Sequence, residues 1–194
     1  LLHLTLEGDA ELKSNYGLDI PSGRAIGTPE ASSKLFTRIA SQDTGTQAYM
    51  LEMWIANANI TQDGPARIFT YSRSNGSRNF MLGQVAYQYV ARNRSYLTAT
   101  NNHGNPEFET YDVDQDAQAS LQHVVLTYDR LRGRRIFVNG VWTDDIDDTA
   151  AGPLWNWATN HQVILGNERS NDRQWIGQIR FAAVYDQSLN ADQV

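Results

Sequence analysis

Residues 175–185 read Trp-Ile-Gly-Gln-Ile-Arg-Phe-Ala-Ala-Val-Tyr, and this stretch predicts the fold more directly than any other. Its odd-numbered positions, from Trp175 to Tyr185, form a continuous apolar row, whereas the even-numbered positions include Gln178 and Arg180. Successive side chains of a strand point to opposite faces of a sheet, so a period of two residues predicts a strand with one buried face. We therefore expect a core strand over residues 175–185.

The same alternation recurs along the chain, and helical periodicity is nearly absent. Further strands are predicted at residues 2–7, 48–57, 66–73, 79–84, 85–92, 122–128, 134–138 and 162–165. Asn139-Gly140 follows one of these strands, and this dipeptide readily supplies the two positive φ angles of a type I′ hairpin turn. Thr28-Pro29 predicts a single helical turn. The predicted fold is therefore all-β: a two-sheet antiparallel β-sandwich with minimal helix.

Composition limits the classes of protein to consider. The chain has 194 residues, with 16 Lys and Arg against 22 Asp and Glu, and no cysteine. The length suits one domain over residues 1–194, and the first residue is Leu rather than Met, so we interpret the chain as a module of a longer protein with other domains. An acidic balance with no Lys/Arg cluster along the sequence argues against a nucleic-acid partner. No run approaches the roughly 18 apolar residues of a membrane span, so we expect no membrane insertion.

Four blocks of sequence resemble a known family. They are Leu51-Glu52-Met53-Trp54-Ile55, residues 123–129 (HVVLTYD), residues 136–140 (IFVNG), and residues 175–179 continuing through 184–189. In this order they resemble the bacterial laminin-G-like, concanavalin A-like jelly-roll domains of lectins and glucanases. The resemblance implies a jelly roll and an extracytoplasmic location. One departure is Arg180-Phe181, where many members have adjacent Asp and Glu.

The resemblance does not fix a function, because this fold hosts lectins, carbohydrate-binding modules, hydrolases, lyases and adhesion modules. Aromatic and planar polar side chains are the groups that hold sugars, through the apolar face of the ring and the hydroxyls around it. Candidate carbohydrate-binding residues are Tyr87, Tyr89, Arg92, Arg94, Asn101, Asn102, Trp155 and Trp157. Tyr87 and Tyr89 would share one strand face about 6.7 Å apart, where core packing and ligand contact are equally open. Either Trp155 or Trp157 is expected to close the open end of the sandwich.

Acidic residues offer a catalytic alternative. A glycosidase usually needs two facing carboxyl groups, and Asp112, Asp114 and Asp116 stand at alternate positions after Glu107 and Glu109. A solvated acidic loop explains the same pattern. By resemblance to the jelly-roll alginate lyases, an arginine from residues 92–94 would act with Gln88, Tyr96 and His103. No catalytic residue is assigned on these grounds.

Calcium is the metal that the acidic residues of the sequence suggest. The aspartates at 112, 114 and 116, and those at 144, 145, 147 and 148, are crowded enough to favour a nearby cation, although solvated charge explains them as well. The resemblance implies a structural Ca²⁺ held by Glu7 and Asp9. No redox or organic cofactor is expected.

The function that the sequence favours is a non-catalytic, lectin-like module that recognises a polysaccharide. The alternatives are a glycan hydrolase or lyase and a spacer or protein-interaction module.

Overall fold

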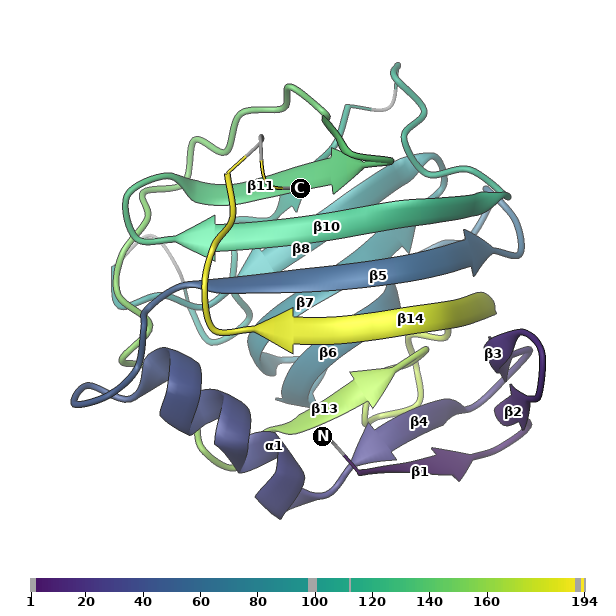
Figure 1. Cartoon of the computed structure of the whole chain (residues 1–194), viewed down its shortest axis with the longest axis horizontal. Coiled ribbons are helices and arrows are strands. Elements are labelled where there is room, and N and C mark those ends of the chain that lie inside the picture. Colours follow the sequence, from purple (N-terminus) through teal and green to yellow (C-terminus); the bar gives the residue numbers. More distant parts are fainter. Residues whose placement is uncertain (1–2, 98–100, 112, 191–192, 194) are drawn as a thin grey trace.

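The protein is a sandwich of two antiparallel sheets, seen in a computed structural model that describes residues 3–97, 101–111, 113–190 and 193 (Figure 1). Within these residues sheet A has the strand order β1-β4-β13-β6-β7-β8-β9, and sheet B has the order β12-β11-β10-β5-β14-β3-β2. Sheet B lies in front in Figure 1 and sheet A lies behind it. The predicted all-β sandwich is confirmed.

The elements have the following bounds. Sheet A contains β1 (Leu4–Glu7), β4 (Arg24–Gly27), β6 (Ala66–Ser74), β7 (Ser77–Val85), β8 (Gln88–Asn93), β9 (Phe108–Glu109) and β13 (Gln162–Leu165). Sheet B contains β2 (Glu11–Lys13), β3 (Gly17–Ile20), β5 (Tyr49–Asn57), β10 (Leu121–Asp129), β11 (Gly133–Val138), β12 (Val141–Trp142) and β14 (Gly177–Tyr185). The helical segments are α1 (Pro29–Leu35) and the π-helical turn Phe36–Ala40. The strands β2, β3, β4 and β9 were not predicted, because each is only two to four residues long and too short to show a period.

Alternate side chains of the long strands build one core between the sheets. In β5, Tyr49, Leu51, Met53 and Ile55 are completely buried and belong to the same cluster as residues of sheet A. Trp157 closes one end of this core, with its ring centroid 5.4 Å from Phe80 and 5.6 Å from Tyr49. Burial of these large rings is the main favourable contribution to folding.

The strand β14 changes face halfway along, which corrects the prediction of one continuous apolar row. Ile179 is buried in the core, but the pairing with β5 shifts at Arg180 in a β-bulge. One extra residue reverses the alternation, so the next odd position, Phe181, pairs with Trp54 and is 43% exposed. Val184, an even position, then packs against the core. The sequence pattern could not show the bulge because both faces carry apolar residues beyond it.

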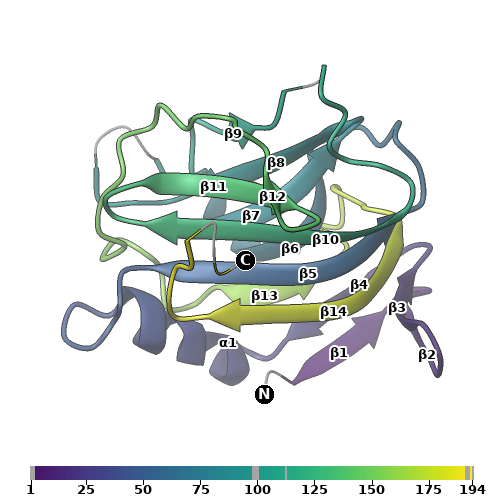
Figure 2. The same cartoon turned by 45° about the horizontal axis from the view of Figure 1, so that its top comes forward.

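The helical segment is longer than the single turn that was predicted. Thr28 caps α1, its Oγ1 accepting a hydrogen bond from Ala31 N–H at 3.2 Å, and the helical path continues to Ala40. Figure 2 shows α1 beside β13 at one end of the sandwich. The polar Ser32 is tolerated on the buried side because its Oγ accepts a hydrogen bond from Val163 N–H at 3.0 Å. None of the helices in the described part of the chain is long and apolar enough to cross a membrane.

The hairpin between β11 and β12 forms as predicted, with φ of 53° at Asn139 and 79° at Gly140. Its strand β11 carries Arg134, which is 2% exposed and forms an ion pair with Asp147, Nε to Oδ2, at 2.7 Å. Arg134 also donates to the carbonyl oxygens of Ala91 at 2.9 Å and Pro106 at 3.0 Å. In the group of aspartates at 144, 145, 147 and 148, the cation next to Asp147 is therefore the guanidinium group of Arg134.

We predict that Asp147→Asn lowers the free energy of unfolding by about 3–5 kcal/mol, because it leaves the buried Arg134 charge without a counter-ion. Burial alone would raise the pKa of Asp147, but the hydrogen bonds and the charge of Arg134 hold this pKa below its ordinary value. The stability from this pair is complete above about pH 4 and is lost as the pH falls through the lower folded-state pKa. Urea denaturation checks both points. The exposed neighbour is the control: Asp148→Asn should change stability by less than about 0.5 kcal/mol.

Candidate functional site

Two exposed aromatic rings, Tyr96 and Trp155, lie together at the end of the sandwich near the strand β8. Tyr96 is 61% exposed and Trp155 is 41% exposed, and their ring centroids are 5.8 Å apart with an interplanar angle of 57°. The two loops that carry them are joined by a hydrogen bond from Tyr96 N–H to the carbonyl oxygen of Pro153 at 2.8 Å, and by another from Asn156 Nδ2 to the carbonyl oxygen of Ser95. We call Tyr96 and Trp155 the aromatic rim.

The position of Trp155 follows from that of Trp157. Trp157 is 4% exposed, and its Nε1 donates to the carbonyl oxygen of Arg94 at 2.7 Å. A hydrogen bond from Trp157 N–H to Leu154 C=O, at 2.9 Å, turns the chain between the two tryptophans. Trp157 therefore closes the end of the sandwich and offers no ring face to a ligand, so its assignment as a binding residue is wrong. Trp155 keeps the exposed position that binding requires.

The predicted pair Tyr87 and Tyr89 is not a ladder. Tyr87 lies in the turn between β7 and β8, next to Ala86 with φ of 48°, and so precedes the strand. Tyr89 is completely buried, and its hydroxyl donates to Gln122 Oε1 at 2.7 Å. The assignment of Tyr89 to ligand stacking is wrong, because its ring packs in the core and burial raises the pKa of its hydroxyl. Tyr87 is half-buried, and its role as a ligand contact stays a prediction.

Arg94 lies beside the aromatic rim and next to buried His161. The Arg94 guanidinium is half-buried, and its Nε has no hydrogen-bond partner among the described residues. His161 is 2% exposed, 3.3 Å from Ser77 Oγ through Nε2. Burial, and after it the positive charges of Arg94 and Arg73, lower the pKa of His161 to about 4. The histidine is thus neutral at pH 7, and the positive charge beside the rim comes from the arginines.

The other predicted polar residues lie on sheet A and its loops. Arg92 forms an ion pair with Glu107, its Nε donating to Glu107 Oε2 at 2.9 Å. Asn101 and Asn102 are exposed in the loop before β9, where the carbonyl oxygen of Asn102 accepts from Arg78 N–H at 3.0 Å. Asn101 Oδ1 is occupied by His103 N–H at 2.9 Å. Arg94 is therefore joined to the loop that carries Trp155 through its backbone carbonyl, which accepts from Trp157 Nε1, whereas Arg92 is engaged in an ion pair.

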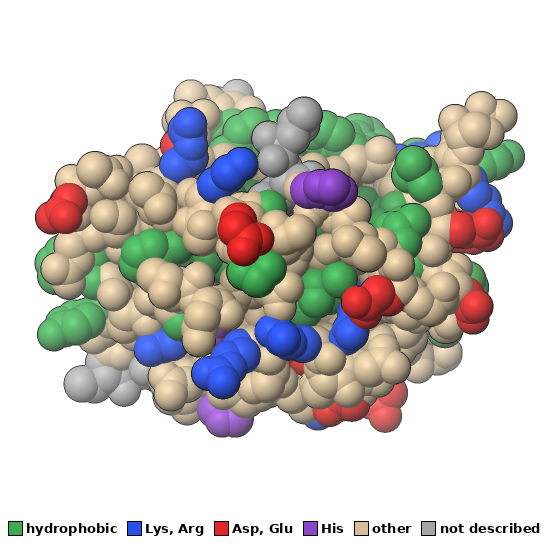
Figure 3. All heavy atoms as spheres, turned by 90° about the horizontal axis from the view of Figure 1, so that it is seen from below, with side chains coloured by type: hydrophobic (Ala, Val, Ile, Leu, Met, Phe, Trp, Pro, Cys, Tyr) green, Lys and Arg blue, Asp and Glu red, His purple; other side chains and the backbone are tan. Residues whose placement is uncertain are grey.

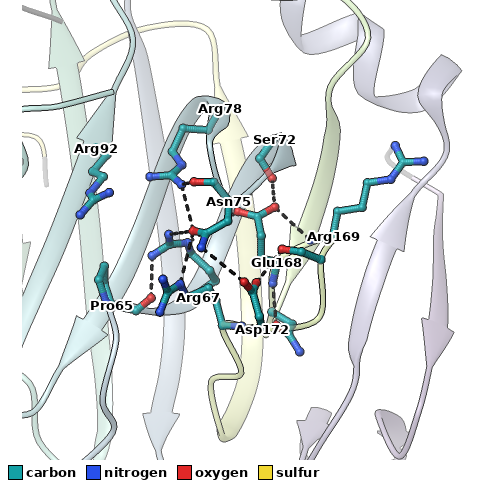
Figure 4. A network of polar contacts seen from close by, with 12 residues as sticks. Pro65, Arg67, Ser72, Asn75, Arg78, Arg92, Glu168, Arg169 and Asp172 are labelled. Carbon is teal, nitrogen blue, oxygen red and sulfur yellow. Dashed lines mark hydrogen bonds and ion pairs between the residues drawn. The ribbon is translucent and has the colours of Figure 1, made fainter. Parts of the chain in front are cut away.

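The outer face of sheet A carries a polar network that the sequence did not reveal (Figure 4). Asn75 Oδ1 accepts hydrogen bonds from three guanidinium groups: Arg67 at 3.1 Å, Arg78 at 3.4 Å and Arg173 at 3.3 Å. The buried Glu168 accepts from Ser72 and lies 3.7 Å from Arg67, Oε2 to Nε. These residues are up to about a hundred positions apart in the chain, so no local pattern could have shown that they meet.

The two acidic groups were considered as calcium sites, and the structure describes all of their aspartates except one. Asp112 lies outside the described residues, and within them no cluster of three or more His, Asp or Glu side chains suits a metal ion. Burial, followed by the charges of Asp145 and Asp114, raises the pKa of Asp116, although a hydrogen bond with Thr110 acts in the opposite direction. Glu7 accepts from Arg24 Nε at 2.7 Å and Asp9 accepts from Ser22 at 2.7 Å. Calcium at Glu7 and Asp9 stays a prediction.

A large hollow in the described part of the surface lies elsewhere. It measures about 430 Å³ and lies between α1, β13 and β14. Its lining is largely apolar and includes Leu35, Phe69, Leu165 and Val184. A sugar needs convergent polar groups beside an apolar surface, so this hollow is a weaker candidate than the aromatic rim.

Comparison with known proteins identifies the fold. A family model described as "Concanavalin A-like lectin/glucanases superfamily" matches residues 31–194. Among solved structures, the binding domain of botulinum neurotoxin serotype D/C has a TM-score of 0.66 and 14% identity, over 98% of this chain and 45% of that chain. The serotype C1 binding domain gives 0.66 and 15%, over 98% and 45%. A botulinum neurotoxin DC binding domain in complex with SialylT gives 0.63 and 14%, over 99% and 44%.

The chain spans less than half the length of these solved domains, and at such identities the likeness shows the fold alone. No curated protein sequence matches this chain.

We predict that stability falls between pH 6.5 and pH 4 because of His161. Its folded-state pKa of about 4 lies below the ordinary value of 6.5, so the unfolded state binds the extra proton and is favoured as the pH falls through this window. His161→Gln should flatten the dependence of the unfolding free energy on pH over this range, relative to the parent protein. Denaturation at a series of pH values measures it. The exposed His103→Gln is the control; an unchanged slope in His161→Gln would contradict the prediction.

Proposed function

The chain belongs to the concanavalin A-like lectin/glucanases superfamily, and from that premise we propose that it is a non-catalytic module that binds a polysaccharide at the aromatic rim. We further propose that it forms one domain of a longer, extracytoplasmic protein. The exposed pair of Tyr96 and Trp155 carries this proposal. Two rings 5.8 Å apart at an open end of the fold offer the apolar platform on which a sugar ring stacks.

Polar groups beside the rings suit the hydroxyls of a sugar. Arg94 Nε is a donor and Asn156 Oδ1 is an acceptor, and both are buried without a hydrogen-bond partner among the described residues. A hydroxyl group both donates and accepts, so a sugar hydroxyl would satisfy either atom. An unsatisfied buried polar group costs about 1–3 kcal/mol, and its pairing with a ligand would recover that free energy.

The similar solved structures support a binding function over a catalytic one, but they do not identify a ligand for this chain. They are described as binding domains, one in complex with SialylT and another with rat synaptotagmin II, and those ligands belong to those proteins.

A catalytic alternative rests on Glu109. Burial, followed by the charge of Glu107, raises the pKa of Glu109, as a general acid requires. Shortened products from a bound glycan, lost in Glu109→Gln, would favour this alternative.

We predict that Trp155→Ala and Tyr96→Ala each weaken polysaccharide binding by about tenfold or more, because each removes half of the platform. Affinity electrophoresis in gels that contain plant or algal polysaccharides measures the retardation. Both side chains are exposed, so the midpoint of thermal unfolding should stay within a few degrees of the parent protein.

The matched control is Tyr111→Ala, which removes another ring that is 59% exposed, from the loop after β9. It should bind as the parent protein does. Equal retardation of the parent, Trp155→Ala and Tyr96→Ala would place the site elsewhere. No retardation of the parent by any glycan would favour a spacer or protein-interaction module.

A further inference from the structure

Four arginines of sheet A and its loops have no carboxylate partner among the described residues. They are Arg73, Arg94, Arg169 and Arg173, and we call them the arginine face. Arg73 and Arg169 are exposed, whereas Arg94 and Arg173 are half-buried. Arg169 donates to Gln162 Oε1 at 2.6 Å and Arg173 donates to Asn75 Oδ1 at 3.3 Å, both neutral acceptors. A guanidinium normally pairs with a carboxylate where one is in reach, so this face has positive charge to spare.

The network beneath the arginine face has the same deficit of negative charge. Asn75 places one neutral amide oxygen where three guanidinium groups converge, and Arg67 and Arg78 each retain a buried Nε without a hydrogen bond (Figure 4). Burial first, and then the charges of neighbouring arginines, lower the pKa of Arg67 to about 9 and that of Arg78 to about 10. Two carboxylates offset part of this charge: buried Glu168, whose Oε2 lies 3.7 Å from Arg67 Nε, and exposed Asp172, whose Oδ2 accepts from Asn75 Nδ2 at 3.4 Å. An anion bound nearby would stabilise both guanidinium groups.

The positive charge of the arginine face is opposite in sign to the net charge of the whole chain, which is −6. Figure 3 shows Lys and Arg side chains gathered in a band on the sheet A side of the surface. Arg94 connects this charge to the aromatic rim, because it is two residues before Tyr96 in the chain and because its charge and that of Arg73 both act on His161. A ligand stacked on Tyr96 would therefore reach Arg94 first among the four arginines.

We propose that the ligand is an anionic polysaccharide, whose repeated carboxylate or sulfate groups bind the arginine face while one sugar unit stacks on Tyr96 and Trp155. This proposal rests on the function proposed above and names the class of glycan. The planar guanidinium group binds a carboxylate or sulfate through two parallel hydrogen bonds, which suits a polymer with regularly spaced acidic groups. A single-stranded nucleic acid has phosphates and stacking bases as well, so it is the competing ligand that the experiment must include.

The experiment measures binding of the chain to four probes by isothermal titration calorimetry. The probes are polygalacturonate, its fully methyl-esterified form, dextran sulfate and single-stranded oligo-dT. We expect polygalacturonate or dextran sulfate to bind, the esterified polymer to bind at least tenfold more weakly, and affinity to fall at least tenfold when the NaCl concentration rises from about 50 to 500 mM. Binding to both acidic polymers would indicate recognition of charge, and binding to one would identify carboxylate or sulfate.

The double variant Arg73→Gln/Arg169→Gln tests the residues. It should lose at least tenfold in affinity for the acidic polymer and keep the thermal midpoint of the parent, because both side chains are exposed. Arg73→Lys/Arg169→Lys should recover part of the loss. The control Arg130→Gln/Arg132→Gln removes the same charge from exposed positions at the β10–β11 turn and should bind as the parent does.

The outcomes separate this proposal from the proposed function. Salt-independent binding of the neutral polymer that needs Trp155 but not the arginines would overturn the anionic ligand and leave the glycan-binding function standing. Equal affinity for oligo-dT through the same arginines would overturn the proposal in favour of a nucleic-acid surface. No binding of any glycan, acidic or neutral, would overturn both.

Discussion

Contact between Tyr49 of sheet B, Phe80 of sheet A and Trp157 of the loop before β13 is the interaction on which the rest of the structure depends. The Tyr49 and Phe80 rings stack at 4.4 Å across the sandwich, and Trp157 stacks on Phe80 at 5.4 Å. Each ring buries a large apolar area, so the contact joins the two sheets and anchors a long loop in the same step. Since Trp157 is fixed inside, the short turn before it leaves Trp155 outside. The position of the candidate site is thus a consequence of core packing.

The polar network on the outer face of sheet A differs from the apolar core in how completely its groups are satisfied. Buried polar groups in most proteins are fully hydrogen-bonded, yet among the described residues Arg67, Arg78 and Glu168 each keep an atom without a hydrogen bond, and the atoms of Arg67 and Glu168 are those of the ion pair at 3.7 Å. Replacement of such a network by apolar residues is often neutral or stabilising, so the network contributes little that stability alone would require. Local violations of the packing rules are expected at functional sites, where a ligand completes what the fold leaves unsatisfied. This is the physical reason for extending the proposed site from the aromatic rim onto this face rather than into the apolar hollow.

The fold could be predicted from sequence because its two strongest signals are local. Alternation in β5 and the Asn139-Gly140 turn each need only a few consecutive residues, and both were confirmed. The bulge at Arg180 could not be predicted, since apolar residues on both sides of it satisfy either register. The binding residues were harder to predict. The alternation of β8 shows that Tyr89 shares a face with its second neighbours but not which face lies on the core, so core packing and ligand contact were equally open until the structure showed Tyr89 buried.

Net charge was the least informative property, and the reason is geometric. Arg73, Arg94, Arg169 and Arg173 are scattered over a hundred positions and lie apart from the arginine-rich residues 130–135, so no local pattern indicates that they act together. In the proposed arginine face, sheet A and its loops bring them together. Electrostatic interactions are screened beyond about 8–10 Å at physiological salt, so the acidic side chains elsewhere on the molecule do little to weaken the local field. An overall negative chain can therefore attract an anion where its cations are gathered and, among the described residues, have no carboxylate partner. The sign of the local field follows from strand order, which composition does not contain.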